Sequence, residues 1–311
     1  MKNILFCFLM SMFAFAFCSC SDEEDTTPSH ADINKFEPAA DDQSEEAQIR
    51  REFKEKTNSY LLFNDTLSKE RTGEDMYGNP VYKIETLDIG YEMVGFGNSY
   101  VYTFDYINTD SEKQRAAQLI ETKLAKKLGG ILPYSLMLAN RIYVCKYNNN
   151  GVLEPAEDSW DNIVPNPTFV LGSRCLAVSV ENGEAYEDAT FFDAMLEDIV
   201  YQKLNSKGNA FLQEFYDAVE NYSRMTSTRK DRLGYERKVD DDLARSLGFA
   251  KDYNRNYFVY SMEWDTRQFL KILLSETQEE YEAQYAAYPI CLKRFSVMRA
   301  KMQELGFNFD V

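Results

Sequence analysis

Hydrophobic and polar positions divide this chain into a strand-rich first half and a helical second half. Apolar side chains recur at helical spacing over residues 44–64 and again from about residue 186 almost to the end. Between these segments, strand-like runs rich in β-branched and aromatic residues occupy residues 81–84, 100–104, 141–147 and 174–180. Strands early and helices late predict an α+β fold.

Local signals mark where several of the helices start and stop. The pattern Ser111-Glu112-Lys113-Gln114 is typical of a capping box, and Thr277-Gln278-Glu279-Glu280 is a second one. Pro289 is expected to start or kink the last helix, and Gly306 is expected to close it. The buried stripe of that helix is predicted to consist of Cys291, Phe295, Met298, Met302 and Leu305.

The first residues have the pattern of an export signal. An apolar stretch at residues 4–17 follows Lys2 and closes on small residues, which indicates a secretory signal and not a membrane span. The run Phe17-Cys18-Ser19-Cys20 resembles the lipobox of bacterial lipoproteins, in which the cysteine after the small residue is lipidated. The resemblance implies that residues 1–19 are removed and that Cys20 anchors the mature protein in the lipid bilayer.

The acidic residues at 22–25 resemble the signal that sends lipoproteins of some Gram-negative bacteria to the outer face of the outer membrane. We therefore expect a lipid-anchored, surface-exposed outer-membrane protein. Cleavage at another small residue, which would release a freely secreted protein, is the alternative. Residues 20–43 are rich in Asp, Glu, Ser and Pro, so a disordered tether is predicted there and one domain over residues 44–311.

Composition and charge exclude several partners. The 34 basic and 51 acidic residues give a formal net charge of −17, which argues against nucleic acid and anionic headgroups. The mature chain would keep Cys145, Cys175 and Cys291, an odd and widely spaced set. Free buried thiols are the prediction, with a Cys145–Cys175 bridge as the alternative. No CxxC pair exists, so thiolate zinc and thioredoxin-like chemistry have no support.

The order of segments resembles a known family of exported proteins. The resemblance is carried by Ile131-Leu132-Pro133 ahead of the strand at 141–147, by Tyr147-Asn148-Asn149-Asn150-Gly151, and by Leu305-Gly306-Phe307 near the end. These pieces resemble the substrate import-associated zinc metallohydrolases, metallopeptidase-like lipoproteins encoded beside outer-membrane nutrient importers. The resemblance implies a zincin-like domain and import-system proteins as partners.

Active members of that family carry an HExxH helix, in which two histidines hold zinc and the glutamate is the general base. Alignment of the helix that starts at Phe191 places Ala194 and Asp198 at the histidine positions and Met195 at the glutamate position. His30, the one histidine of the chain, lies in the predicted tether. The third ligand region, near residues 256–258, has no clear acidic ligand. The expectation is a catalytically inactive protein with no metal and no cofactor.

Other chemistries leave weaker signals. Calcium ligands are conceivable in the loop at 148–151 or at Asp240-Asp241-Asp242, although a turn and a helix start explain these segments more simply. Two acids distant in sequence can meet as a glycosidase-type pair. A sugar-stacking surface would draw on tyrosines such as Tyr60, Tyr100, Tyr102, Tyr186, Tyr201 and Tyr222.

These observations favour a binding or scaffolding protein that assists a nutrient-import system and takes a peptide or glycan ligand. Two alternatives stay open. One is a hydrolase that uses acidic residues in the same cleft, and a pocket with carboxylates of raised pKa would favour it. The other is a purely structural partner-binding lipoprotein, which a large exposed apolar patch would favour.

Overall fold

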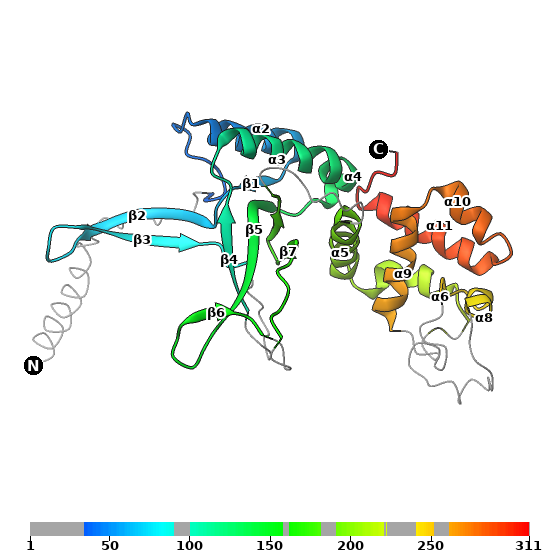
Figure 1. The fold of residues 1–311 in the computed structure, drawn as a ribbon. Helices are drawn as coiled ribbons and strands as arrows, with labels where there is room; N and C mark the ends of the chain where they lie inside the picture. Colours follow the sequence, from blue (N-terminus) through cyan, green and yellow to red (C-terminus); the bar gives the residue numbers. More distant parts are fainter. Residues whose placement is uncertain are drawn as a thin grey trace, which may run out of the picture. The chain divides into compact units, whose positions relative to one another are not determined.

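The computed structural model describes residues 34–89, 100–157, 162–181, 191–220, 222, 241–251 and 261–310. The chain divides into the units Met1–Lys35 and Phe36–Val311, and the fold described below is that of the second unit. This unit is a mixed α+β structure with a strand-rich N-terminal half and a helical C-terminal half (Figure 1), which confirms that part of the prediction. No described helix is long and apolar enough to cross a membrane.

The 13-residue strand β5 (Ser135–Tyr147) organises a sheet of six described strands. Its first half pairs in parallel with two neighbours, and its second half pairs antiparallel with two others. The parallel neighbours are β1 (Tyr60–Leu62) and β8 (Cys175–Ser179), and the antiparallel ones are β4 (Val101–Tyr106) and β6 (Leu153–Pro155). The strand β7 (Phe169–Leu171) pairs antiparallel with β8.

Alternating side chains give the sheet two buried faces. Leu61, Leu136 and Leu138 belong to the large core, whereas Tyr60, Met137 and Ala177 belong to a second cluster that also contains Phe36. The helices α2 (Glu45–Thr57) and α3 (Asp110–Ile120) contribute to the large core, which continues into the C-terminal helices described below. A π-helical turn (Glu121–Ala125), α4 (Lys126–Leu128) and a 3₁₀ turn (Gly129–Ile131) continue α3 toward β5.

Two helix boundaries differ from the sequence prediction. The first helix stops at Thr57, because Asn58 adopts a left-handed conformation and Tyr60 already belongs to β1. The helix expected to open at Ser111 is capped by Thr109 instead, and Thr109 and Glu112 form the capping box. A hydroxyl stands at both positions, but the acid three residues after Thr109 is the one that reaches back. The capping box of Thr277 and Glu280 is confirmed.

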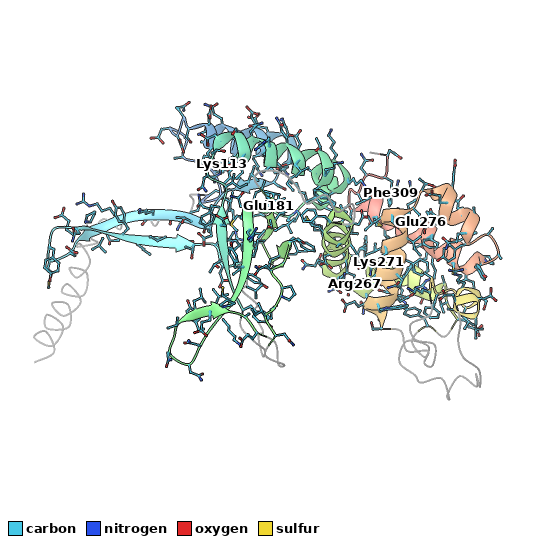
Figure 2. The ribbon with its side chains drawn as sticks, in the orientation of Figure 1. Lys113, Glu181, Arg267, Lys271, Glu276 and Phe309 are labelled. Carbon is cyan, nitrogen blue, oxygen red and sulfur yellow. The ribbon has the colours of Figure 1, made fainter. Side chains whose placement is uncertain are left out.

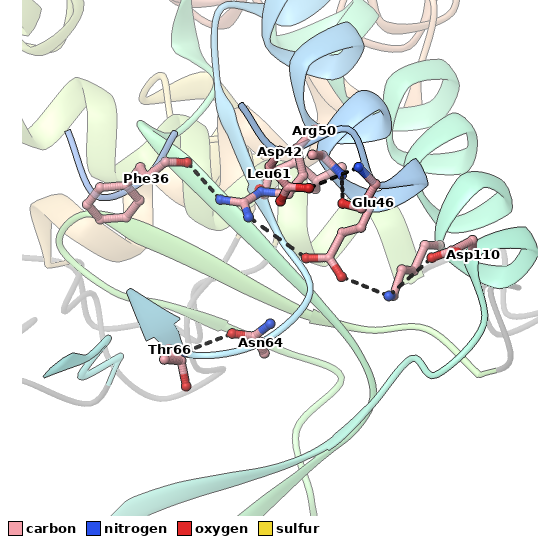
Figure 3. Close-up of polar contacts among 11 residues, drawn as sticks. Phe36, Asp42, Glu46, Arg50, Leu61, Asn64, Thr66 and Asp110 are labelled. Carbon is pink, nitrogen blue, oxygen red and sulfur yellow. Dashed lines mark hydrogen bonds and ion pairs between the residues drawn. The ribbon is translucent and has the colours of Figure 1, made fainter. Parts of the chain in front are cut away.

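The segment just before α2 belongs to the folded unit (Figure 3). Phe36 is 5% exposed, and its carbonyl accepts a 2.9 Å hydrogen bond from Arg50 Nη2. Arg50 Nε donates to the carbonyl of Leu61 at 2.8 Å, so one guanidinium ties this segment to β1. Burial lowers the pKa of Arg50. The compact unit therefore begins at Phe36, ahead of the boundary that composition placed at residue 44.

The C-terminal half is a group of packed helices. They are α5 (Phe191–Ser206), α6 (Gln213–Asp217), α8 (Asp241–Ser246), α9 (Met262–Ser275), α10 (Gln278–Gln284) and α11 (Pro289–Glu304), with a 3₁₀ turn at Asn209–Leu212. The helix α5 packs against α9, and α11 packs against α6, α8 and α9. Four members of the predicted α11 stripe are fully buried, namely Cys291, Phe295, Met298 and Met302, whereas Leu305 is half-buried.

The strands β2 (Thr66–Glu74) and β3 (Pro80–Thr86) form a separate two-stranded antiparallel hairpin. Every residue of β3 is exposed. Hydrogen bonds stabilise the turn between the strands: the Asp75 carboxylate accepts from the backbone N–H groups of Tyr77 and Asn79 at 2.8 and 2.9 Å. This turn presents Met76 and Tyr77 at 87% and 82% exposure.

The three predicted thiols are free. In the sheet register, Cys145 near the end of β5 lies opposite Val101 of β4, whereas Cys175 of β8 lies opposite Ser135, the first residue of β5. The two cysteines are therefore near opposite ends of β5 and do not approach each other. Cys175 and Cys291 are buried, and burial raises the pKa of each thiol to about 12. Cys145 is only half-buried. Thiols with such pKa values stay protonated near neutral pH, which makes Cys175 and Cys291 poor nucleophiles.

Candidate functional site

The helix α5 carries the three positions that the sequence resemblance aligns with HExxH. Ala194 is exposed, Met195 is fully buried in the large core, and Asp198 lies one helical turn after Ala194 with its side chain 38% exposed. The side chain at the position of the general base thus packs among apolar residues. Of the three, only Asp198 offers a polar group.

The guanidinium of Arg267, which α9 carries (labelled in Figure 2), lies beside Asp198. Arg267 Nη1 lies 2.6 Å from Asp198 Oδ1 and 3.0 Å from Glu197 Oε1. Its Nε donates to Glu263 Oε1 at 3.1 Å. The guanidinium also lies 4.2 Å from the ring centroid of Tyr201. Together, three carboxylates and one aromatic ring hold this cation between α5 and α9.

Two cations, Arg267 and Lys271, lie among the three carboxylates of this cluster. Burial disfavours the charge on Arg267, but the hydrogen bonds that it donates to Asp198, Glu197 and Glu263 outweigh burial and raise its pKa above the ordinary value. Lys271 adds a second cation 3.6 Å from Glu197 Oε2. Within the described residues, no group of three His, Cys, Asp or Glu side chains forms a set that could hold a metal ion.

Sequence reasoning missed Arg267. Its ion pair with Glu263, four residues earlier on α9, is visible as a helical spacing. Its contacts with α5 join Arg267 to residues that lie 69 and 70 positions earlier in the sequence. No local sequence pattern predicts such contacts. The third ligand region at 256–258, together with Asp252, lies outside the described residues.

The loop at 148–151, which composition made a calcium candidate, is a turn. The Asn148 side-chain oxygen accepts hydrogen bonds from the backbone N–H groups of Asn150 and Val152, each at 2.9 Å. Gly151 adopts a φ of 73°, which suits glycine at this point of the turn. Asp241 and Asp242 belong to the first turn of α8, and Asp242 accepts a hydrogen bond from the Tyr288 hydroxyl. Asp240 lies outside the described residues.

The tyrosines considered for a sugar platform are spread over separate elements. Tyr60 and Tyr102 pack in or against the second cluster of the sheet, whereas Tyr201 and Tyr222 pack in or against the large core. Tyr100 is half-buried, and Tyr186 lies outside the described residues. The structure does not bring the described members of this set together as one surface.

Two adjoining cavities lie in the helical half instead. The smaller, of about 250 Å³, is lined by the end of α9, the residues leading into α10, Arg299 of α11, Lys127 and residues 307–309. The larger, of about 380 Å³, lies between α10 and α11. Gln278 and Arg299 line both cavities, so they form the shared wall.

The smaller cavity has charged and apolar walls. Arg299 lies 3.9 Å from the ring centroid of Phe309. Glu276 also lines this cavity, and its Oε2 atom is buried without a hydrogen-bond partner among the described residues. Burial, and then the charge of Glu280, raises the pKa of Glu276. Figure 2 labels Glu276 and Phe309 in this part of the structure.

No family model, no curated protein and no solved structure matches this chain. The zincin-like reading of the fold therefore rests on the sequence resemblance, and the coarser statement, an α+β unit with the observed sheet and helices, rests on the structure.

Proposed function

We propose that this chain is a surface-anchored lipoprotein whose zincin-like folded unit binds a ligand without hydrolysing it, as an accessory to an outer-membrane nutrient-import system. Cys20 would carry the lipid anchor. The observation that supports the loss of hydrolysis is the Arg267 guanidinium, which is held against Asp198 and Glu197 at 2.6 and 3.0 Å.

The chemistry of zinc hydrolysis explains why this observation matters. The metal needs nitrogen, sulfur or carboxylate ligands with an open position for water, and the water needs a nearby base. Here Arg267 and Lys271 already pair with Asp198, Glu197 and Glu263, so a metal ion bound by these carboxylates would have to displace a resident cation. The buried thioether of Met195 cannot accept a proton from water.

The alternative hydrolase would use acidic residues of the same region. Glu197, Asp198 and Glu263 are the acids that meet there, and each is bound to Arg267. A general acid requires a proton near neutral pH, which burial away from cations would provide. All three carboxylates are already engaged by the Arg267 guanidinium, so this arrangement favours binding over acid catalysis.

The test is elemental analysis of the mature chain carrying Cys20→Ser, after incubation with zinc and calcium and dialysis into metal-free buffer. We expect no stoichiometric metal and no cleavage of casein or of a mixed peptide library. A zinc ion retained by this protein and lost in Asp198→Asn would contradict the proposal and assign the metal to α5. Glu279→Asn, on the exposed first turn of α10, is the control substitution.

A second candidate function is structural association through the hairpin. The hairpin carries five of the large hydrophobic side chains that are exposed, namely Met76, Tyr77, Val81, Tyr82 and Ile84. Within the described residues β3 pairs with β2 alone, so its other edge has no strand beside it. Two register shifts interrupt β2, whereas β3 runs without an extra residue. Such irregularities protect an edge from pairing, so β3 is the edge that can take another strand.

The occupant that fits this edge is a second copy of the same strand. An antiparallel pair with Ile84 opposite Ile84 places Lys83 of each copy opposite Glu85 of the other. Tyr82 then faces Thr86 on the same side as Ile84. The two-fold register thus joins opposite charges on one face and apolar side chains on the other.

Sedimentation velocity of the Cys20→Ser chain tests this association. We expect a dimer that Ile84→Lys disrupts and that Met76→Lys, the same change at the exposed tip, leaves intact. Lys83→Glu should weaken the dimer, and the exchange Lys83→Glu with Glu85→Lys should restore it. A monomer at about 100 μM, which corresponds to an association weaker than about 5–6 kcal/mol, would exclude this second function.

A further inference from the structure

The cavities beside Arg299 are built into the fold at a point where two distant segments are joined. The backbone N–H of Asn308 donates to the carbonyl of Lys127 at 2.8 Å. Close by, a Cβ on Gly129 would stand 2.4 Å from the carbonyl oxygen of Gly306, so only glycine permits this approach. Gly129 and Gly306 have φ values of 49° and 101°. These contacts fix the C-terminal residues as a wall of the smaller cavity.

That wall is apolar. Phe307 is 5% exposed, and its ring centroid lies 4.7 Å from that of Phe309. Leu273 and Leu274 line the same cavity from the end of α9. Small-ligand pockets have volumes of about 300–1,000 Å³. The larger cavity, of about 380 Å³, lies within this range, and the smaller one, of about 250 Å³, lies just below it. An apolar group of side-chain size therefore fits against Phe307, Phe309 and the two leucines.

The charge of the smaller cavity has the opposite sign to that of the whole protein. Arg299 and Lys127 line it, and in the described part of the chain neither side chain has an ion pair with a carboxylate. Stacking on Phe309 orients the Arg299 guanidinium. The acidic lining residue, Glu276, has a raised pKa. On a chain of net charge −17, this cavity is thus a local cationic site.

Most of the remaining polar lining groups are hydroxyls and amides, and the larger cavity adds the Glu282 carboxylate. Ser275, Thr277 and Asn308 line the smaller cavity, Ser296 lines the larger one, and Gln278 lines both. These groups can donate to and accept from a peptide bond. A neutral sugar would leave the Arg299 cation without a partner of opposite charge.

We propose that the smaller cavity binds the free C-terminus of a short peptide, with Arg299 holding the terminal carboxylate. A guanidinium binds a carboxylate through two parallel hydrogen bonds, which gives both affinity and orientation. The last side chain of the peptide lies against Phe307 and Phe309, and the residue before it extends past Gln278 into the larger cavity. This inference rests on the proposed function, since it assumes a peptide that is held and not cleaved.

Isothermal titration calorimetry on the Cys20→Ser chain tests it with three probes: N-acetyl-Gly-Phe, its C-terminal amide, and maltose. We expect the free acid to bind at least tenfold more tightly than the amide and maltose not to bind. Arg299→Gln should weaken binding of the acid at least tenfold and abolish the preference over the amide. Arg299→Lys keeps the positive charge but loses the pair of parallel N–H donors, so an intermediate loss of affinity for the acid is expected.

Lys293→Gln is the matched control, because it removes a cation from an exposed position of the same helix. Its affinity for the acid should equal that of the parent chain. Unchanged thermal unfolding of Arg299→Gln would show that a loss of binding is local. Three results would overturn the inference. They are equal affinity of the parent chain for the acid and the amide, an affinity for the acid that Arg299→Gln leaves unchanged, and the absence of binding heat with every probe. Zinc content reports on α5 separately, so a failure here is distinguishable from a failure of the proposed function.

Discussion

Replacing Arg294 with methionine is expected to lower the free energy of unfolding by about 3–5 kcal/mol, the cost of breaking a buried ion pair by removing one partner. Arg294 and Asp265 are both fully buried, and two guanidinium nitrogens of Arg294 contact the two carboxylate oxygens of Asp265. Without Arg294, the Asp265 carboxylate would remain in the core with no cation. A loss of this size is a large fraction of the stability of a typical domain, about 5–15 kcal/mol.

The same guanidinium joins several segments of the helical half. Arg294 Nε donates to the carbonyl of Phe215 at 3.0 Å, and Nη1 donates to that of Gly248 at 2.7 Å. Its carbon lies 3.8 and 4.5 Å from the ring centroids of Phe215 and Phe269. Arg294 therefore connects α11 with α6, α9 and the segment after α8, and its removal should affect the helical half as a unit.

Tyr222 completes the network. Its hydroxyl donates to Asp265 Oδ2 at 2.7 Å. Burial, followed by the nearby charge of Asp265, raises the pKa of Tyr222. The phenol therefore stays protonated and remains a donor. With Arg294 removed, this single hydrogen bond would be insufficient to compensate the buried carboxylate.

Urea unfolding followed by circular dichroism measures the effect. Lys293→Met, an exposed position beside Arg294, is the matched control and should change stability by no more than about 0.5 kcal/mol. The double variant Arg294→Met with Asp265→Asn should be more stable than Arg294→Met alone, because the unpaired charge is gone. If Arg294→Met cost less than about 1 kcal/mol, the pair would not have the role assigned to it here.

The elements that sequence predicted well are those whose signals are local. The capping box of Thr277 and Glu280 spans four residues, and the α11 stripe repeats within one helix, so both could be found without a structure. The end of the first helix was missed. Its periodicity continues into β1, and only the pairing of Tyr60 with Ser135 shows that these residues form a strand.

The site depended on contacts that sequence does not encode locally. The alignment identified Asp198 as a degenerate motif position, but its partner Arg267 comes from another helix. The cavities next to Arg299 unite α9, α10, α11, the C-terminal residues and Lys127. Because residues 127 and 308 are far apart in sequence, no window of the chain contains both sides of the smaller cavity. The contact that holds Phe36 to Arg50 at the start of the compact unit likewise joins residues that are distant in sequence.

Replacing Cys20 with serine is expected to remove nearly all of the protein from the membrane fraction. The apolar segment at residues 4–17 is shorter than the roughly 20 residues that span a bilayer as a helix. Membrane attachment would therefore depend on the lipid at Cys20. The whole chain has 51 acidic and 34 basic residues. The protein therefore has little electrostatic attraction of its own to anionic headgroups.

Cys18→Ser is the decisive control, because it makes the same change two residues earlier and leaves Cys20 in place. Fractionation of cells that express each variant, followed by immunoblotting, should find Cys18→Ser in the outer membrane and Cys20→Ser outside it or unprocessed. Protease added to intact cells should degrade the Cys18→Ser protein if the unit faces outward. Membrane retention of Cys20→Ser would instead mean that another part of the chain holds the protein there, and the accessory role at an importer would lose its anchor.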